Sequence, residues 1–245
     1  GEAIWHMHPV VFLGAINSPL ELINIDDFLN EYEKQHSSFA SGTPELTQGS
    51  RRNLEKILTN INLFYSQSAE YTPNLYRLSY MLATARHETY HFPSGEYFSE
   101  QPEVGEVSYF NKYDPILALT EAEKNRAFEN GNVLQGDGFR YRGRGCVHLT
   151  WKNNYQKAKD KYSVDFVNHP ELASDFKYAI PIMVWGMEEG IFTGKKLSTY
   201  INSVSIDYEG ARKVINGSDQ KFLIANYAKK FQGILEKTST VPLSF

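Results

Sequence analysis

The sequence predicts a mainly α-helical protein, and three observations support this fold class. In several long segments, apolar residues recur three and four positions apart, which is the spacing of one helix face. Only one short run, 146–150, looks like a strand. Internal repeats and low-complexity tracts are absent. The 245 residues are therefore expected to form one large domain or two small lobes.

The N-terminal half is expected to contain an arm and three helices. Residues 1–17 are apolar and aromatic without a clear period, and we expect either a strand or an extended arm that packs on the body. The apolar spacing predicts helices at 18–37, at 50–67 and from Pro73 to about His91. The segment 38–49 is rich in Ser, Gly, Thr and Pro, which predicts a loop. We place a boundary there, between an N-terminal part (1–47) and a main domain (48–245).

The C-terminal half begins with a loop-like segment, 100–114. Thr120 and Glu123 have the spacing of a capping box, which predicts a helix that ends near Asn130. The segment 131–145 has five glycines in fifteen residues, a density that indicates close approach of the backbone to a ligand or to another backbone. Further helices are predicted at 151–162, at 175–190 with a kink at Pro181, at 207–215 and at 218–236.

The composition excludes several classes of protein. A net charge of −4 argues against a nucleic-acid-binding protein, whose affinity depends on a basic surface. Cys146 is the only cysteine, so neither an internal disulfide nor a cysteine-based metal site is expected. The apolar run near the start is too short to span a membrane, and we expect no signal peptide.

The stretch 82–100 (LATARHETYHFPSGEYFSE) has two chemical interpretations. The first is a zinc metalloprotease, because His87 and His91 would share a helix face with Glu88 beside them as a base. The longer metzincin pattern is incomplete, because position 94 is Ser rather than Gly and no further histidine follows before His148. The pair His6 and His8 also lacks a convincing metal-ligand spacing.

The second interpretation is a glycoside hydrolase. Inversion at a glycosidic bond needs a protonated acid and a carboxylate base, roughly 6.5–9.5 Å apart. Glu88 ends a strongly apolar helix, and we expect low-polarity surroundings that keep its carboxyl group protonated. His87 or Arg86 would tune this acid.

The partner carboxylate is expected on a loop opposite Glu88. Glu96 follows a Pro-Ser-Gly break at 93–95, which would fold the chain back toward the acid. Glu100, Glu103 and Glu106 are less favoured candidates for this role.

Six motifs resemble glycoside hydrolase family 19, the chitinase and endolysin family of the lysozyme-like superfamily. They occur in order between about residues 75 and 227: ATARHET, GEYF, SYFNKYDP, GNVLQGDGFRYRGRGCVHLTWKNNY, VNHPELA and VINGS. The resemblance implies a two-lobed, mainly helical fold with a central cleft and a small β element, and makes 48–245 the catalytic domain. It also implies an inverting mechanism without a metal or cofactor.

The resemblance also implies roles for individual residues. Glu88 would be the general acid, Glu96 the general base, and Thr150 the hydroxyl that helps to hold the attacking water. The substrate-binding residues would be His87, Tyr141, Arg142, Arg144, His148, Asn154 and Asn216. The family usually has Gln where this chain has His148, so that sugar contact is altered or the site is pH-sensitive.

The implied function is hydrolysis of β-1,4 bonds in peptidoglycan, because the glycine-rich motif resembles bacterial and phage wall-cleaving members. A chitinase and a non-catalytic glycan-binding module are the alternatives. The opening run WHMHPVVFL resembles the lead-in of members carried on type VI secretion or phage-tail spikes. We therefore expect an endolysin or antibacterial effector that is made in the cytoplasm. It would reach the periplasmic wall through a secretion system or holin, with a spike carrier and an immunity protein as possible partners.

Overall fold

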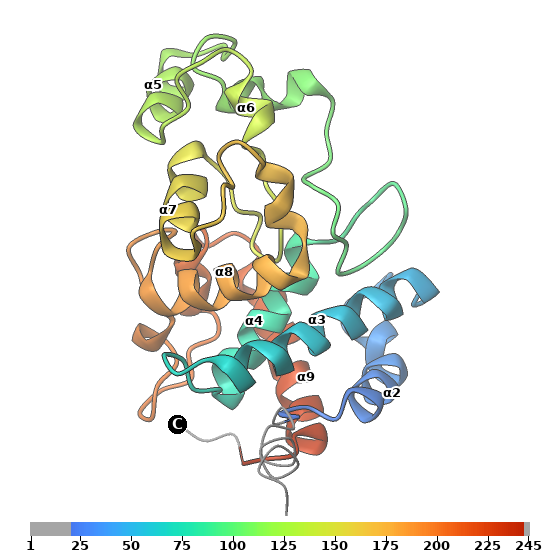
Figure 1. Cartoon of the computed structure of the whole chain (residues 1–245). Helices are drawn as coiled ribbons and strands as arrows, with labels where there is room; N and C mark the ends of the chain where they lie inside the picture. The colour runs from blue at the N-terminus through green and yellow to red at the C-terminus, as the bar shows by residue number, and fades with distance from the viewer. Residues whose placement is uncertain (1–20, 243–245) are drawn as a thin grey trace, which may run out of the picture.

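A computed structural model describes residues 21–242, and its mainly helical architecture confirms the predicted fold class (Figure 1). The predicted arm at 1–17, with His6 and His8, lies outside the described residues. The α-helices are α2 (Ile25–Gln35), α3 (Gln48–Gln67), α4 (Leu75–Glu88), α5 (Glu121–Glu129), α6 (Asp137–Arg140), α7 (Lys152–Tyr162), α8 (Phe176–Glu189) and α9 (Lys221–Thr238). Short 3₁₀ helices, η1 to η5, cover His36–Ser38, Val107–Tyr113, Pro170–Ser174, Leu197–Thr199 and Gly210–Val214.

Helix α4 lies at the centre of the lower body. It packs along α9, and α2, α3 and α8 surround the pair (Figure 1). Its residues from Leu78 to Arg86 are all buried, which explains why the sequence of α4 is apolar on nearly every face. Phe28 and Tyr32 of α2 belong to the same core. The N-terminal helix thus packs on the main domain, and the boundary between 47 and 48 stays a prediction.

The ends of two helices differ from the prediction for local reasons. Helix α2 begins at Ile25 rather than near residue 18, and Asn24 caps it by accepting a hydrogen bond from the Asp27 amide. Ile23, just before it, instead forms a bridge with Ser239. Helix α4 ends at Glu88, short of His91, because the next residues turn away from the helix axis.

The upper lobe contains η2, α5 and α6, and α7 lies between this lobe and α8 (Figure 1). The capping box at Thr120 and Glu123 is present, as predicted. The segment 107–113, predicted as loop, is the 3₁₀ helix η2. Its Phe110 is buried and meets the Phe139 ring at 5.6 Å between centroids. Tertiary contacts such as this one order the segment, since its own sequence has no helical period.

The close backbone approach expected in 131–145 is present. A Cβ at Gly138 would lie 2.5 Å from the Phe110 carbonyl oxygen and 2.9 Å from the Asp114 nitrogen. Gly145 has φ = +69°, and a Cβ there would lie 2.5 Å from the Ala173 carbonyl oxygen. These glycines therefore let η2 and η3 pack against the segment, backbone to backbone.

The β element consists, within 21–242, of isolated bridges. The strand predicted at 146–150 is a tight turn closed by one bridge between Arg144 and Leu149. Gly145 and His148, with φ of +69° and +47°, reverse the chain, and neither value suits a strand. The segment predicted as a helix at 207–215 is the shorter 3₁₀ helix η5.

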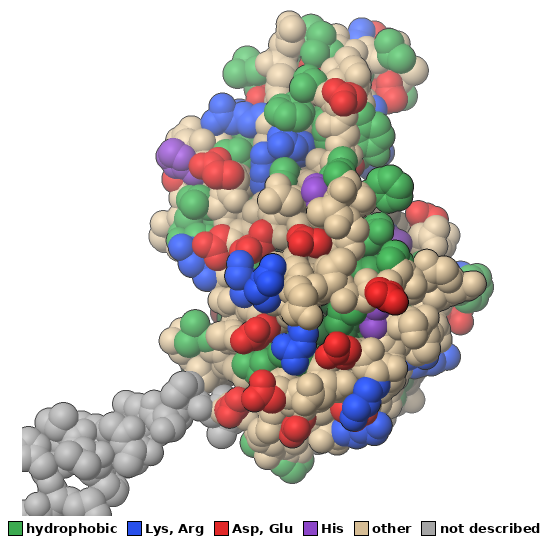
Figure 2. Space-filling model, turned by 90° about the vertical axis from the view of Figure 1, so that its right-hand side faces the viewer, with side chains coloured by type: hydrophobic (Ala, Val, Ile, Leu, Met, Phe, Trp, Pro, Cys, Tyr) green, Lys and Arg blue, Asp and Glu red, His purple; other side chains and the backbone are tan. Residues whose placement is uncertain are grey.

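The surface shows a narrow upper part above a broader lower body (Figure 2). Lys and Arg side chains are interspersed with Asp and Glu over this face (Figure 2). Among the described helices, none has the length and apolarity required to cross a membrane.

Candidate active site

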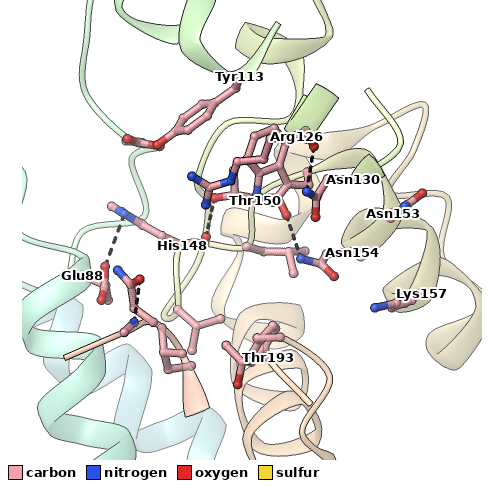
Figure 3. A pocket seen from close by; sticks show the side chains of 18 of the residues that line it. Glu88, Tyr113, Arg126, Asn130, His148, Thr150, Asn153, Asn154, Lys157 and Thr193 are labelled. Carbon is pink, nitrogen blue, oxygen red and sulfur yellow. Dashed lines mark hydrogen bonds and ion pairs between the residues drawn. The ribbon is translucent and has the colours of Figure 1, made fainter. Parts of the chain in front are cut away.

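A cleft of about 790 Å³ separates the upper lobe from the lower body. The upper lobe lines it with Tyr113, Arg126 and Asn130, and the lower body lines it with Glu88 and Thr193 (Figure 3). The segment 147–154 lines it between them. A volume of this size suits a ligand of several rings.

Glu88 is the last residue of α4 and lines the cleft. Its Oε1 accepts a hydrogen bond of 2.6 Å from Nη1 of Arg212, whose side chain is only 3% exposed. Its Oε2 lies 3.8 Å from Nδ1 of His148 (Figure 3). The predicted low-polarity surroundings are therefore wrong, because a buried guanidinium and an imidazole flank this carboxyl group. Arg212 fixes one oxygen and leaves the other toward the cleft.

The zinc interpretation of HETYH fails on the backbone. Since α4 ends at Glu88, His87 and His91 do not share a helix face. His91 instead places Nδ1 2.6 Å from the Ser94 hydroxyl oxygen. Burial lowers the pKa of His87, which is not among the cleft-lining residues, so its predicted substrate contact is not supported. No cluster of three or more His, Cys, Asp or Glu side chains suited to a metal occurs within residues 21–242.

The prediction that the 93–95 turn brings Glu96 opposite Glu88 is wrong. Glu96 pairs with His91 in a bridge, and its carboxyl group packs against Gly49 in the first turn of α3. A Cβ at Gly49 would overlap the Glu96 carboxyl oxygen. A carboxylate at a helix N-terminus interacts favourably with the helix dipole, which gives Glu96 a structural position away from the cleft.

Glu103, a less favoured candidate from its sequence context, is the second carboxylate of the cleft. Its backbone amide donates to the Gly143 carbonyl oxygen at 2.8 Å, and its Oε2 accepts from the Gly143 amide at 3.2 Å. Glu100 and Glu106 do not line the cleft, because Glu100 forms an ion pair with Lys56 and Glu106 is exposed elsewhere on the surface.

His148 and Thr150 also line the cleft, in a stretch of backbone with an unusual conformation. His148 has φ = +47° and Trp151 has φ = +77°, values that cost energy in non-glycine residues and are frequent at functional sites. The Thr150 hydroxyl donates to the His148 carbonyl oxygen at 2.7 Å. The lone pairs of this hydroxyl remain available to accept a hydrogen bond from a molecule in the cleft.

Asn154 and Asn216 line the cleft, as predicted for sugar-binding residues. The Asn154 amide nitrogen donates to the Thr150 carbonyl oxygen at 2.9 Å, which leaves its carbonyl oxygen as an acceptor. The Asn216 carbonyl oxygen accepts from the Gly217 amide at 2.8 Å, which leaves its amide group as a donor. The pair can thus offer one acceptor and one donor to hydroxyl or N-acetyl groups. Their substrate contacts stay predictions.

Tyr141, Arg142 and Arg144 do not line the cleft, so their assignment to its wall is wrong. The Tyr141 hydroxyl is turned inward and donates to the Val167 carbonyl oxygen at 3.1 Å. The Arg142 guanidinium lies 3.9 Å from the Phe139 ring centroid. Arg144 is buried and donates to nearby backbone carbonyls and to the Tyr155 hydroxyl. These three residues stabilise the turn that carries Gly143, and so they act on the position of Glu103.

Sequence reasoning missed several residues of the site. Arg212 gave no local signal, because it lies 124 positions from Glu88. Tyr113 lies in the motif SYFNKYDP, and Trp151 lies in the motif that ends with LTWKNNY. Both residues line the cleft, and their rings meet edge to face at 4.9 Å between centroids. The Arg126 guanidinium lies 5.4 Å from the Trp151 ring. This group forms an aromatic wall suited to the flat face of a sugar ring.

The fold and the cleft define a two-lobed, mainly helical protein. No family model matches the chain. An alignment of 93 positions, which covers 34% of this chain, is 30% identical to a glycosyl hydrolase family 19 domain-containing protein of Haemophilus influenzae. The chain spans only 46% of the length of that curated relative.

Solved structures give the same assignment for the fold. Chitinase C from Streptomyces griseus aligns with a TM-score of 0.51 over 94% of this chain and 99% of its own, with 18% identity. A mutant of chitinase C aligns with the same score and coverage, with 17% identity. A bacterial family 19 chitinase aligns over 87% of this chain and 98% of its own, with a TM-score of 0.45 and 20% identity. The chain shares the fold of chitinase C, and its similarity to a family 19 domain-containing protein confirms the resemblance predicted from its motifs.

Proposed function

We propose that this chain is an inverting glycoside hydrolase that cleaves β-1,4 bonds in a glycan containing N-acetylglucosamine. One observation carries the proposal: Glu88 and Glu103 line one cleft, together with His148 and Thr150. Glu88 belongs to the lower body, whereas Glu103 is held by the upper-lobe residue Gly143. A bound strand would therefore lie between an acid and a base.

Glu88 is the general acid in this proposal. Its Oε1 is held by Arg212, so its Oε2 is the oxygen that donates the proton to the leaving glycosidic oxygen. Because α4 is packed in the core, the carboxyl group has a fixed position relative to the cleft.

Glu103 is the general base, and Thr150 helps to hold the water. A water molecule that donates one hydrogen to the Glu103 carboxylate can donate the other to the Thr150 hydroxyl oxygen. As the water attacks the anomeric carbon, Glu103 takes its proton, and the bond to the leaving oxygen breaks as Glu88 protonates it. The product has the inverted anomeric configuration.

Peptidoglycan and chitin are the two candidate substrates. The glycine-rich motif resembles wall-cleaving members of the family, which favours peptidoglycan. The solved structures of similar fold are chitinases by name, which keeps chitin as the second candidate. Both glycans contain β-1,4-linked N-acetylglucosamine and could use the same acid and base.

Delivery to the bacterial wall is a further part of the proposal. It is supported only by the resemblance of WHMHPVVFL, at residues 5–13, to the lead-in of spike-borne members. The roles of endolysin or type VI effector, and the partners that they require, rest on the same residues. Co-purification of the chain with a candidate spike protein, compared with a version lacking residues 1–17, tests this part.

The test of the mechanism is Glu88→Gln. We expect release of reducing ends from digested glycan to fall by roughly 10²–10⁴-fold, the usual contribution of a general acid, with the circular dichroism spectrum unchanged. Mass spectrometry of peptidoglycan and chitin digests identifies the bond that is cut, and NMR of the first product gives its anomeric configuration. Activity of a tenth of wild type or more in Glu88→Gln contradicts the role of Glu88.

A further inference from the structure

Three lysines, Lys157, Lys195 and Lys213, are among the residues that line the cleft. Figure 3 shows Glu88 on one side of the cleft and Lys157 on the other. All three lysines are exposed, and none of them forms an ion pair with a residue in the range 21–242. Lys157 makes only a long contact of 3.4 Å to the Ile191 carbonyl oxygen.

Most lysines elsewhere on the surface differ in this respect, although Lys112, Lys152, Lys229 and Lys230 also form no ion pair among residues 21–242. Nine lysines of the described chain form ion pairs with carboxylates. The contrast is sharpest between neighbours: Lys196 pairs with Glu189 at 3.0 Å, whereas Lys195, beside it in the chain, faces the cleft unpaired.

Four basic and three acidic side chains line the cleft. The basic ones are the three lysines and Arg126, which packs on Trp151. The acidic ones are Glu103, Glu129 and Glu88, and Glu88 is paired with the buried Arg212. The chain as a whole carries a net charge of −4, so the excess of basic groups in the cleft runs against its overall charge. A concave surface of one sign concentrates ligands of the other sign.

We infer that the glycan bound here carries carboxylate groups on substituents that project from the strand. This inference rests on the proposed function and selects peptidoglycan, whose peptide stems bear carboxylates, over chitin, which is uncharged. Asn154 and Asn216 offer the hydrogen-bonding groups that a sugar requires. The exposed lysines at the rim instead suit groups that extend beyond the sugar rings, and a neutral strand has nothing to pair with them.

The experiment measures cosedimentation with insoluble glycans, using the inactive Glu88→Gln protein as parent. The glycans are native sacculi, sacculi whose carboxylates have been amidated with carbodiimide and ammonia, and chitin. The cleft variant adds Lys157→Met, Lys195→Met and Lys213→Met. The control variant adds Lys34→Met, Lys56→Met and Lys177→Met, which remove the same formal charge at exposed sites away from the cleft.

We expect the cleft variant to bind native sacculi roughly tenfold more weakly than the parent, as three exposed charge contacts allow. The control variant should bind like the parent, and 0.5 M salt should remove the difference. Amidated sacculi and chitin should bind parent and cleft variant alike. Equal binding of native and amidated sacculi by the parent, equal loss in both lysine variants, or absence of binding to native sacculi overturns the inference. Because binding is read without hydrolysis, these outcomes are separate from a failure of wild type to release reducing ends, which would overturn the proposed function.

Discussion

Replacement of Glu103 by Gln tests the second carboxylate most directly, because Gln keeps the shape of the side chain. The Gly143 amide donates to Oε2 of Glu103 at 3.2 Å, and the amide oxygen of Gln can accept the same bond. The variant should therefore lose about 1 kcal/mol of stability or less. It can no longer take a proton from water. A general base contributes roughly 10²–10⁴-fold, which corresponds to about 3–5 kcal/mol in the activation free energy.

The matched control is Glu96→Gln, since Glu96 has the same chemistry seven positions before Glu103 in the chain. Its carboxyl group packs at Gly49 in the first turn of α3, so the variant loses a favourable charge at a helix N-terminus. We expect a cost of about 0.3–1 kcal/mol in the free energy of unfolding, and hydrolysis within about twofold of wild type, because Glu96 is not at the cleft.

The assay is the initial rate of reducing-end release over a range of substrate concentrations, with urea unfolding of each variant in parallel. For Glu103→Gln, the loss should appear in kcat rather than in KM, because the base acts only in the transition state. If Glu96→Gln loses more than a hundredfold while Glu103→Gln retains a tenth of the activity, the assignment drawn from the cleft geometry is refuted.

Two further predictions concern stability. Burial, and then the charge of Arg86, lower the pKa of His36 from 6.5 to about 4. Because the unfolded chain takes up this proton first, the free energy of unfolding should fall by at most about 3 kcal/mol between pH 6.5 and pH 4. In urea unfolding, His36→Gln should flatten this dependence, and an equal slope in both proteins would contradict it. Gly138→Ala places a Cβ 2.5 Å from the Phe110 carbonyl oxygen and should cost roughly 1–3 kcal/mol. The control is Gly233→Ala in α9, where the added Cβ meets no atom within 4 Å. This substitution should raise the free energy of unfolding by about 0.5–1 kcal/mol. Similar melting temperatures for the two variants would rule out the clash at Gly138.

The helices are predictable because their signals are local. The apolar spacing of α3, α7 and α8 and the capping box of α5 each lie within a single segment. Pro181 lies inside α8, as expected for a kinked helix. The wrong predictions for η2 and for the 145–148 turn share one cause, since both segments take their shape from groups far away in the chain.

The path of the loop after α4 shows why the prediction of Glu96 as the base is wrong. The Tyr97 amide donates to the Ser50 hydroxyl at 2.9 Å, and the Asn53 side chain donates to the Tyr97 carbonyl oxygen at 3.3 Å. These contacts tie the loop to α3, more than forty positions before it in the chain. The turn residues at 93–95 do reverse the chain, as expected, but the reversal brings Glu96 to α3. Which of several glutamates reaches a cleft is thus decided by tertiary contacts that no local pattern contains.

The glycine-rich motif is the most specific feature of the sequence, and its function differs from the predicted cleft wall. Its glycines let two other backbones approach, and its arginines and tyrosine stabilise a turn. The product of this packing is a short stretch of backbone that places three groups: Gly143 holds Glu103, His148 reaches Glu88, and Thr150 lines the same cleft. Because this motif acts through the position of its backbone, the residue types at its glycines and buried polar positions are the most strongly constrained. The side chain at position 148 is less constrained, because it only has to reach Oε2 of Glu88 from a left-handed backbone conformation. That difference explains how this chain can carry His148 where the resembling family usually has Gln and still keep both carboxylates at the cleft.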